Sequence, residues 1–153
     1  MGSRVLSNLE KLYLTIKKLS LKIKDGSDYF NNAHEAGIPI KNLKKLQNNL
    51  FGLEANFEEL SAIDFKKGCY IGQENTARMK LKGKVRKKLL PLISEEILNI
   101  GDDLLFNNNK IGKVLIDRPF PFGLIKIFDP DLKSLENAEL VAGEKKCKIL
   151  KSC

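Results

Sequence analysis

Residues 104–128, LLFNNNKIGKVLIDRPFPFGLIKIF, decide the fold of the second half of the chain. Runs rich in Leu, Ile, Val and Phe alternate with Asn, Gly and Pro, which is typical of short strands joined by tight turns. Residues 104–106 and 110–116 flank three asparagines and predict a β-hairpin, and residues 122–128 predict a further strand. The stretch therefore predicts antiparallel β-structure.

The segments on either side of this stretch add further strands. Residues 145–151, KKCKILK, alternate polar and apolar side chains, and residues from about 84 to 93 do the same before Ser94. Several short strands separated by Gly, Pro and Asn indicate a small barrel from about residue 86 onward. We therefore predict an antiparallel β-barrel domain over residues 84–153.

The first half of the chain predicts a hairpin and short helices. Residues 12–24, LYLTIKKLSLKIK, alternate apolar and polar side chains around two lysines, which predicts two half-buried strands. Helical signals follow at residues 27–37, at residues 41–50, at a turn capped by Asn56, and at residues 73–81. The predicted fold class is therefore α+β.

Composition and charge exclude several classes of protein. The 153 residues are 42% hydrophobic, so one domain or two small ones can bury a core, and no apolar run approaches the roughly 20 residues of a membrane helix. Three cysteines without ligand spacing indicate neither a disulfide framework nor a zinc site, which favours a reducing cytoplasm. Residues 61–93 hold most of the net charge of +8, so this stretch is expected to attract an anion or to be a solvated lysine surface.

Cys69 has the surroundings of a reactive thiol. Lys66 and Lys67 precede it, Gly68 and Gly72 bracket the loop, and the predicted helix starts just beyond. Two cations and a positive helix end lower the pKa of a thiol, which suits a nucleophile or a metal ligand. The alternative is a small buried hydrophobic residue.

The remaining thiols and the histidine fit structural roles. Cys147 lies in an alternating strand pattern, and Cys153 ends the chain. His34 is the one histidine of the sequence, so it has no histidine partner for a dyad and is expected on the surface or satisfied in the core.

Residues 67–74, KGCYIGQE, resemble the KGCYxGQE signature of the YgfZ family. This family comprises folate-binding relatives of the glycine-cleavage T-protein and includes mitochondrial factors for late 4Fe-4S cluster assembly. The resemblance continues at positions between 76 and 89 and upstream at residues 54–57 and 37–39, in unchanged order. A family member is about twice as long, so the chain is expected to be a fragment that corresponds to the second half.

The resemblance implies a fold and a site. Residues 1–83 would form the remainder of a T-protein-like folate-binding domain, followed by the barrel of residues 84–153. Cys69 would be the reactive thiolate, favoured by the charge of Lys67. The implied cofactor-binding residues are Glu54, Gly68, Tyr70, Gly72, Gln73, Glu74 and Arg78. The implied cofactors are tetrahydrofolate, in an incomplete site, and a transient iron-sulfur cluster; no resident metal site is expected.

Three positions depart from the family pattern. Ala33 stands where the family usually has Arg, Gly52 replaces the usual Pro, and residues 2–4 read Gly-Ser-Arg instead of Asp-Pro-Arg. These departures affect the pterin or tail-binding side of the ligand site. We therefore expect weak or absent tetrahydrofolate binding by this chain alone.

The favoured function is that of a YgfZ-like, folate-linked factor in 4Fe-4S cluster assembly or repair, more consistent with an assembly factor than with an enzyme. The alternatives are a folate-dependent aminomethyl or one-carbon transferase, an RNA-binding module based on the alternating basic residues 78–88, and an inactive truncated remnant. Expected partners are iron-sulfur assembly proteins or 4Fe-4S clients and a separate N-terminal half. Neither a membrane nor nucleic acid is an expected partner.

Overall fold

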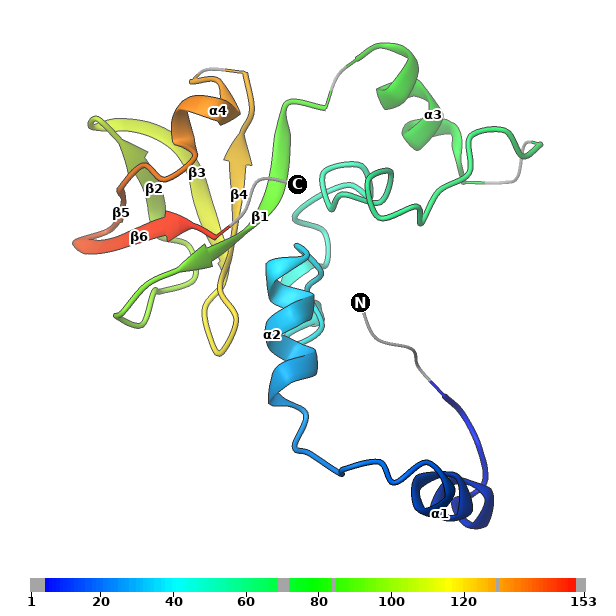
Figure 1. Cartoon of the computed structure of the whole chain (residues 1–153). Helices are drawn as coiled ribbons and strands as arrows, with labels where there is room; N and C mark the ends of the chain where they lie inside the picture. The colour runs from blue at the N-terminus through cyan, green and yellow to red at the C-terminus, as the bar shows by residue number, and fades with distance from the viewer. Residues whose placement is uncertain (1–4, 69–71, 84, 129, 151–153) are drawn as a thin grey trace.

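The computed structural model describes residues 5–68, 72–83, 85–128 and 130–150 (Figure 1). The elements in chain order are α1 (Leu9–Lys18), α2 (Ser27–Glu35), the 3₁₀ helix η1 (Leu43–Leu46), α3 (Glu74–Leu81), β1 (Lys87–Ile93), β2 (Asp103–Phe106), β3 (Asn109–Ile116), β4 (Phe122–Lys126), α4 (Leu132–Leu135), β5 (Leu140–Ala142) and β6 (Lys145–Ile149). The predicted α+β class is confirmed.

The six strands form a closed antiparallel barrel in the order β1-β4-β3-β2-β5-β6, as predicted. Asn107 and Asn108 have φ angles of 49° and 62°, which fits the tight β2–β3 hairpin. Gly112 permits close approach of β3 and β4, since a Cβ there would lie 2.4 Å from the Leu124 carbonyl oxygen. Sequence reasoning missed β5 and α4, which are short.

The barrel holds most of the buried apolar side chains among the described residues. Leu90, Leu104, Val114 and Ile125 are fully buried in its interior. A second cluster, around Leu89 and Phe122, covers the outside of β1 and β4. The inner cluster stabilises the barrel, and the outer cluster provides the apolar surface against which the first half of the chain packs.

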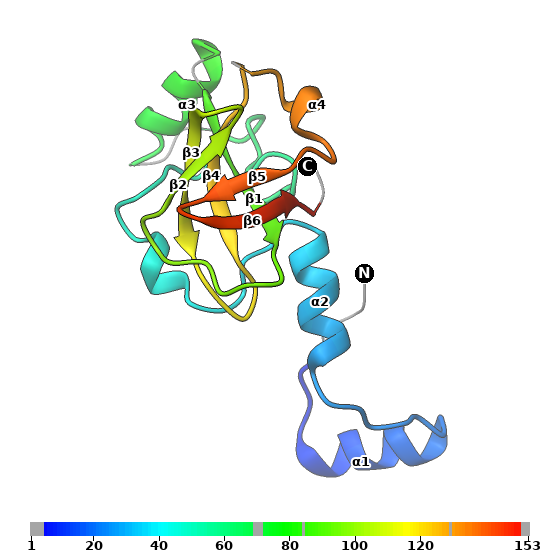
Figure 2. The same cartoon turned by 90° about the vertical axis from the view of Figure 1, so that its left-hand side faces the viewer.

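Residues 12–24 do not form the predicted hairpin, and that prediction was wrong. Residues 9–18 form α1, whose N-cap Asn8 accepts a 2.9 Å hydrogen bond from the Lys11 amide at its side-chain oxygen. Leu9, Leu12, Tyr13 and Ile16 fall at helical spacing, whereas Leu12, Leu14 and Ile16 alternate with other residues, so the segment fits both structures. The cap and the absence of a described strand beside the segment favour the helix. Figures 1 and 2 show α1 standing away from the barrel.

The other helical predictions had mixed outcomes. Helix α2 is confirmed, with Gly26 rather than Ser27 or Asp28 as N-cap. Residues 41–50 contain only the short η1, because Asn42 and Asn48 adopt φ angles of 61° and 60°, outside the right-handed helical region.

Helix α2 is anchored to the barrel through His34. The buried ring donates from Nε2 to the Pro121 carbonyl oxygen at 2.9 Å, and its centroid lies 5.0 Å from that of Phe122. Burial lowers the pKa of His34, and the bond to Pro121 opposes this effect only in part. Of the two placements expected for His34, on the surface or satisfied in the core, the structure shows the second. In the part of the chain that the structure describes, no helix has the length and apolarity needed to cross a membrane.

Candidate functional site

The two glycines of the KGCYIGQE motif differ in backbone conformation. Gly72 has a φ of +95°, in the left-handed region that favours glycine, whereas the φ of Gly68 lies outside that region. A Cβ at either position would meet no atom within 4 Å, so conformation rather than space requires glycine at position 72. Lys67 is exposed beside them. Cys69 and Tyr70 lie outside the described residues.

Helix α3 follows the motif, as predicted. Gln73 occupies the N-cap position without a side-chain cap bond, and Glu74 is the first helical residue. One face of α3 carries Asn75, Arg78 and Met79, which are spaced at i, i+3 and i+4. The helix therefore places Arg78 on the same surface as the apolar side chain of Met79.

The turn that carries Glu54 is fixed to strand β1. Leu89 donates from its amide to the Glu54 carbonyl oxygen at 2.7 Å, and the Leu89 carbonyl oxygen accepts from Asn56 Nδ2 at 2.7 Å. The Glu54 carboxylate in turn accepts a 3.0 Å bond from the Phe51 amide. These bonds hold Glu54 against the barrel and fix the direction of its side chain.

The turn predicted after Asn56 forms, since the Leu60 amide donates to the Asn56 carbonyl oxygen at 2.9 Å, but the predicted cap by the Asn56 side chain was wrong. Its φ of 60° is left-handed, its side chain is fully buried, and its amide reaches Leu89 instead of the following backbone. Its Oδ1 has no hydrogen-bond partner among the described residues. An Asn tolerates this conformation better than most residues, which explains the residue type.

Gly52 accommodates a neighbouring aromatic ring. A Cβ at this position would lie 2.8 Å from Phe57 Cδ2, closer than ordinary contact allows. The ring of Phe57 thus fills the space where a proline side chain at position 52 would begin.

A pocket of about 390 Å³, here called the arginine pocket, lies where the Glu54 turn, α3 and β1 meet. Its lining residues are Phe51, Glu54, Asn75, Arg78, Met79, Arg86 and Lys87. The structure therefore brings together Glu54 and Arg78 of the predicted site. It adds Arg86 and Lys87, which sequence reasoning counted only as part of the basic stretch.

A neighbouring pocket of about 270 Å³, here called the paired-charge pocket, shares Met79 with the arginine pocket. Glu58 pairs with Lys80, and Glu59 pairs with Lys88. Burial, the largest single cause, would raise the pKa of Glu59, but the hydrogen bond from Lys88, a backbone hydrogen bond and the charges of Lys88 and Lys80 together outweigh it and hold this pKa below its ordinary value. These pairs link the segment before the motif to α3 and β1.

The alternating basic residues 78–88 do not form one continuous strand. Arg78 and Lys80 lie on α3, whereas Lys87 and Lys88 lie on β1. Acidic side chains neutralise two of these cations, Lys80 and Lys88. The described structure therefore lacks the linear track of phosphate contacts on which the RNA-binding alternative depends.

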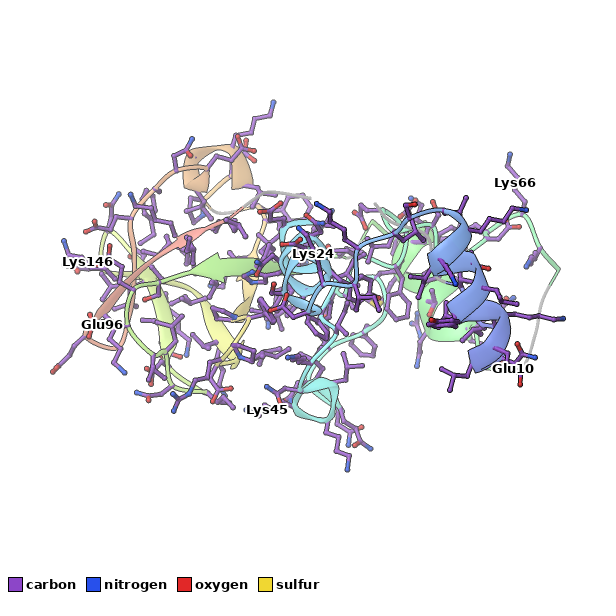
Figure 3. The ribbon with its side chains drawn as sticks, turned by 60° about the horizontal axis from the view of Figure 1, so that its bottom comes forward. Glu10, Lys24, Lys45, Lys66, Glu96 and Lys146 are labelled. Atoms are coloured by element: carbon purple, nitrogen blue, oxygen red, sulfur yellow. The ribbon has the colours of Figure 1, made fainter. Side chains whose placement is uncertain are left out.

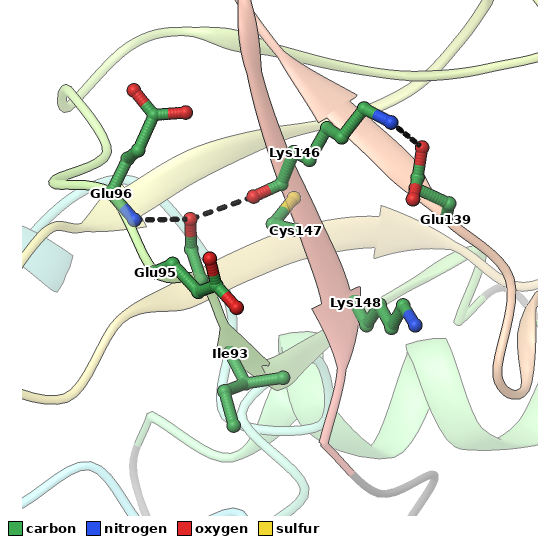
Figure 4. A pocket seen from close by; sticks show the side chains of 8 residues that line it. Ile93, Glu95, Glu96, Glu139, Lys146, Cys147 and Lys148 are labelled. Atoms are coloured by element: carbon green, nitrogen blue, oxygen red, sulfur yellow. Dashed lines mark hydrogen bonds and ion pairs between the residues drawn. The ribbon is translucent and has the colours of Figure 1, made fainter.

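A third pocket, of about 410 Å³, lies outside the barrel beside β6 (Figure 4). There the Ser94 hydroxyl donates to the Lys146 carbonyl oxygen at 2.7 Å, and Lys146 pairs with Glu139 at 2.7 Å. Cys147 is 2% exposed, and burial raises the pKa of its thiol to about 11. This thiol stays neutral near pH 7, so the structural role predicted for Cys147 is confirmed.

The third pocket lies far from the motif. Figure 3 shows Lys66 and Lys146 at opposite ends of the molecule. Within residues 5–68, 72–83, 85–128 and 130–150, no three His, Cys, Asp or Glu side chains gather around a common point that could hold a metal ion. The candidate site is therefore assigned to the arginine pocket and the adjoining motif.

Comparison with known proteins finds relatives but no matching family model. Over 119 residues the chain is 38% identical to the mitochondrial iron-sulfur cluster assembly factor IBA57 homolog of Dictyostelium discoideum, covering 74% of this chain and 29% of that protein. Over 116 residues it is 42% identical to the Neurospora crassa protein of the same name, covering 75% and 24%. Mouse IBA57 is 38% identical over 68 residues, 44% of this chain and 19% of that protein.

The relatives correct the predicted location and show how much of their own length this chain covers. Each of these three proteins is named as mitochondrial, so the predicted cytoplasmic location was wrong. The cysteine content indicates a reducing environment, which does not identify a compartment. The chain spans between 24% and 29% of the length of the Dictyostelium and Neurospora proteins.

Proposed function

The chain belongs to the YgfZ family, as a homologue of IBA57 proteins over about three quarters of its length, and we propose that it acts in mitochondrial iron-sulfur cluster assembly. The observation that carries the proposal is the identity of 38% over 119 residues to a named assembly factor. The partners in this role are iron-sulfur assembly proteins or the 4Fe-4S proteins that receive clusters.

The match includes the candidate site. A match over 74% of 153 residues leaves about 40 residues outside it, so residues from about 41 to 113 fall within it wherever it begins. This central part holds the Glu54 turn, the KGCYIGQE motif, α3 and the start of β1. The similarity therefore supports a shared role for these elements.

Cys69 is the proposed reactive residue. Lys66 and Lys67 precede it in sequence, and α3 begins at Glu74, so cations and the positive end of a helix favour a thiolate. Cys147 offers the opposite environment, since its thiol is buried and neutral. The iron-sulfur cluster is cargo in this proposal, and Cys69 is its transient point of contact.

The folate linkage is proposed for the arginine pocket. Glu54 offers a carboxylate to hydrogen-bond donors of a ligand, and Arg78 offers a cation to its carboxylates. Gly68, Tyr70, Gly72, Gln73 and Glu74 complete the proposed ligand-binding set. Ala33 lacks the charge of the usual arginine, so the chain alone is expected to bind tetrahydrofolate weakly.

The test is rescue of cells that lack their own IBA57-like protein. The chain fused to the N-terminal part of a relative is expected to restore the activity of a 4Fe-4S enzyme. Cys69→Ser is expected to abolish rescue, whereas the matched control Cys147→Ser is expected to retain it if expression is equal. Full rescue by Cys69→Ser would remove this residue from the proposed mechanism.

A further inference from the structure

Helix α1 exposes an apolar face to solvent. Leu9, Leu12, Tyr13 and Ile16 are spaced at i, i+3, i+4 and i+7, so they lie on one side of the helix. The exposed fraction is 81% for Leu9 and 65% for Tyr13, and no residue of α1 is buried. Figure 2 shows α1 at the end of the molecule away from the barrel. This face is therefore accessible to a partner outside the described chain.

The polar side of α1 and the segment after it are rich in lysine. Residues 5–24 contain five lysines and one acid, Glu10, so their net charge is +4. Lys24 pairs with Asp28. The other four lysines are exposed and form no ion pair within the described chain: Lys11, Lys17, Lys18 and Lys22. A surface with this excess of cations attracts a partner of opposite charge.

The charge argues against a second copy of this chain as the partner. Two copies packed through α1 would bring two lysine-rich segments together, and like charges repel. A helix of 10 residues also offers little area compared with the roughly 800 Å² per partner that a stable protein interface buries. The partner is therefore expected to carry negative charge and to accept apolar side chains.

The distribution of the apolar side chains favours a bilayer over a folded acidic protein. Exposed apolar residues continue beyond both ends of α1, at Val5 and Leu6 before it and at Leu21 and Ile23 after it. These residues lie outside the helix, so a protein groove of fixed shape would have to match several separate positions. A fluid layer of acyl chains accepts such a set, and the long stems of lysine let the charges reach lipid headgroups.

We infer that α1 binds the surface of a bilayer that contains anionic lipids, with the helix axis parallel to the membrane plane. Leu9, Leu12 and Ile16 enter the boundary between headgroups and acyl chains, and Lys17 and Lys18 contact the headgroups. The contact involves one leaflet and does not cross the membrane. This inference departs from the expectation, drawn from sequence, that no membrane is a partner.

The first experiment measures co-sedimentation of the complete chain with vesicles of phosphatidylcholine and phosphatidylglycerol, and with vesicles of phosphatidylcholine alone. Binding is expected only with the anionic vesicles, and it weakens as the salt concentration rises. Replacing both Lys17 and Lys18 by Gln is expected to weaken binding about twentyfold, since each lysine near an anionic surface contributes about fivefold.

The matched control removes two positive charges from the barrel domain. Lys113 and Lys133 are exposed and form no ion pair within the described chain. Replacing both by Gln is expected to change vesicle binding less than about twofold, because charges far from the membrane are screened by salt. Equal weakening by the two double variants would overturn the inference, because it would indicate general attraction of a basic protein.

The second experiment tests the orientation of the helix. Leu9→Gln removes an apolar side chain from the proposed membrane face, whereas Leu14→Gln makes the same change to an exposed leucine on the opposite side of α1. Leu9→Gln is expected to weaken binding about tenfold and Leu14→Gln about twofold or less. Leucine and glutamine have similar helix propensities, so loss of the helix would not explain a difference between these variants. Equal effects would contradict the proposed face.

The third experiment reports insertion directly. The sequence contains no tryptophan, so Tyr13→Trp introduces a single fluorescent reporter. Its emission is expected to shift to shorter wavelength with the anionic vesicles and to be quenched by lipids brominated on their acyl chains. Unchanged emission from a chain that sediments with these vesicles would overturn the insertion of this face.

Two further outcomes would assign α1 to a different partner. Self-association without lipid that Leu9→Gln abolishes would assign the apolar face to a second copy of the chain. Binding of soluble polyglutamate as tight as that of the anionic vesicles, and equal in Leu9→Gln, would assign the lysines to an acidic protein. Either result would overturn the inference of a membrane contact.

Discussion

The barrel and the N-terminal arm, defined as residues 5–83, bury their side chains in different ways. The barrel encloses its own core, as the fully buried Leu90 and Leu104 illustrate. In the described part of the arm, by contrast, only the side chains of Ala33, Leu53, His34 and Asn56 are buried, together with Gly37, which has no side chain. His34 and Asn56 achieve this by bonding to barrel residues. The arm therefore depends on the barrel for its order, and the barrel does not depend on the arm to the same degree.

The largest expected effect lies in the barrel core. Leu104→Ala is expected to lower the free energy of unfolding by about 2–5 kcal/mol, because it removes a fully buried side chain and leaves a cavity. Leu14→Ala on α1 is the matched control, and its effect is expected to stay within about 0.5 kcal/mol because that side chain is exposed. Denaturant unfolding measures both. Comparable losses would contradict the contrast between barrel and arm.

The attachment of the arm comes next. Asn56→Ala is expected to lower the free energy of unfolding by about 1–3 kcal/mol. The Leu89 carbonyl oxygen loses its buried donor, and alanine adopts a positive φ less readily than asparagine does. Hydrogen exchange at the Leu89 amide, which bonds to Glu54, is the direct measurement. The exposed Asn48 shares the positive φ, so Asn48→Ala serves as the control for backbone strain. Unchanged exchange at Leu89 in Asn56→Ala would show that the turn is held by other contacts.

Substitution of a motif glycine is expected to have a smaller effect on stability, confined to the arm. Gly72→Ala is expected to destabilise the start of α3 by about 1–2 kcal/mol, because alanine disfavours a φ of +95°. Gly68→Ala adds the same methyl group without that angle and is expected to have little effect. Hydrogen exchange of the α3 amides compares the two variants. Equal exchange would mean that the backbone at position 72 relaxes at no cost.

The smallest expected effect is the pH dependence of the α2 anchor. The pKa of His34 is lowered by burial, so the unfolded chain binds a proton more readily than the folded one. Stability is therefore complete above about pH 6.5, the unfolded value, and falls as the pH drops from there toward the folded pKa. His34→Gln is expected to flatten unfolding curves over this window. An unchanged slope in the variant would assign the pH dependence to other groups.

Sequence reasoning predicted the barrel better than the arm, for a physical reason. In residues 104–128 the alternation, the turn asparagines and the core all require the same structure, so local pattern and tertiary packing agree. In residues 12–24 the pattern fits a helix or a strand, and no neighbour in the described chain decides between them. The candidate site shows the same division. Arg78 was predicted from the family resemblance that continues beyond the motif, whereas the contribution of Arg86 depends on where β1 begins, which sequence alone places only approximately.

The way in which β1 is covered has a consequence for solubility. Strand β6 pairs with β1 only at Leu92 and Ile93, and the Glu54 turn satisfies the amide and carbonyl of Leu89. If this turn detaches, Leu89 presents an unpaired donor and acceptor on the edge of a sheet. Such an edge accepts a strand from another molecule and is a starting point for aggregation. The same two bonds that orient Glu54 therefore protect the barrel from intermolecular strand pairing.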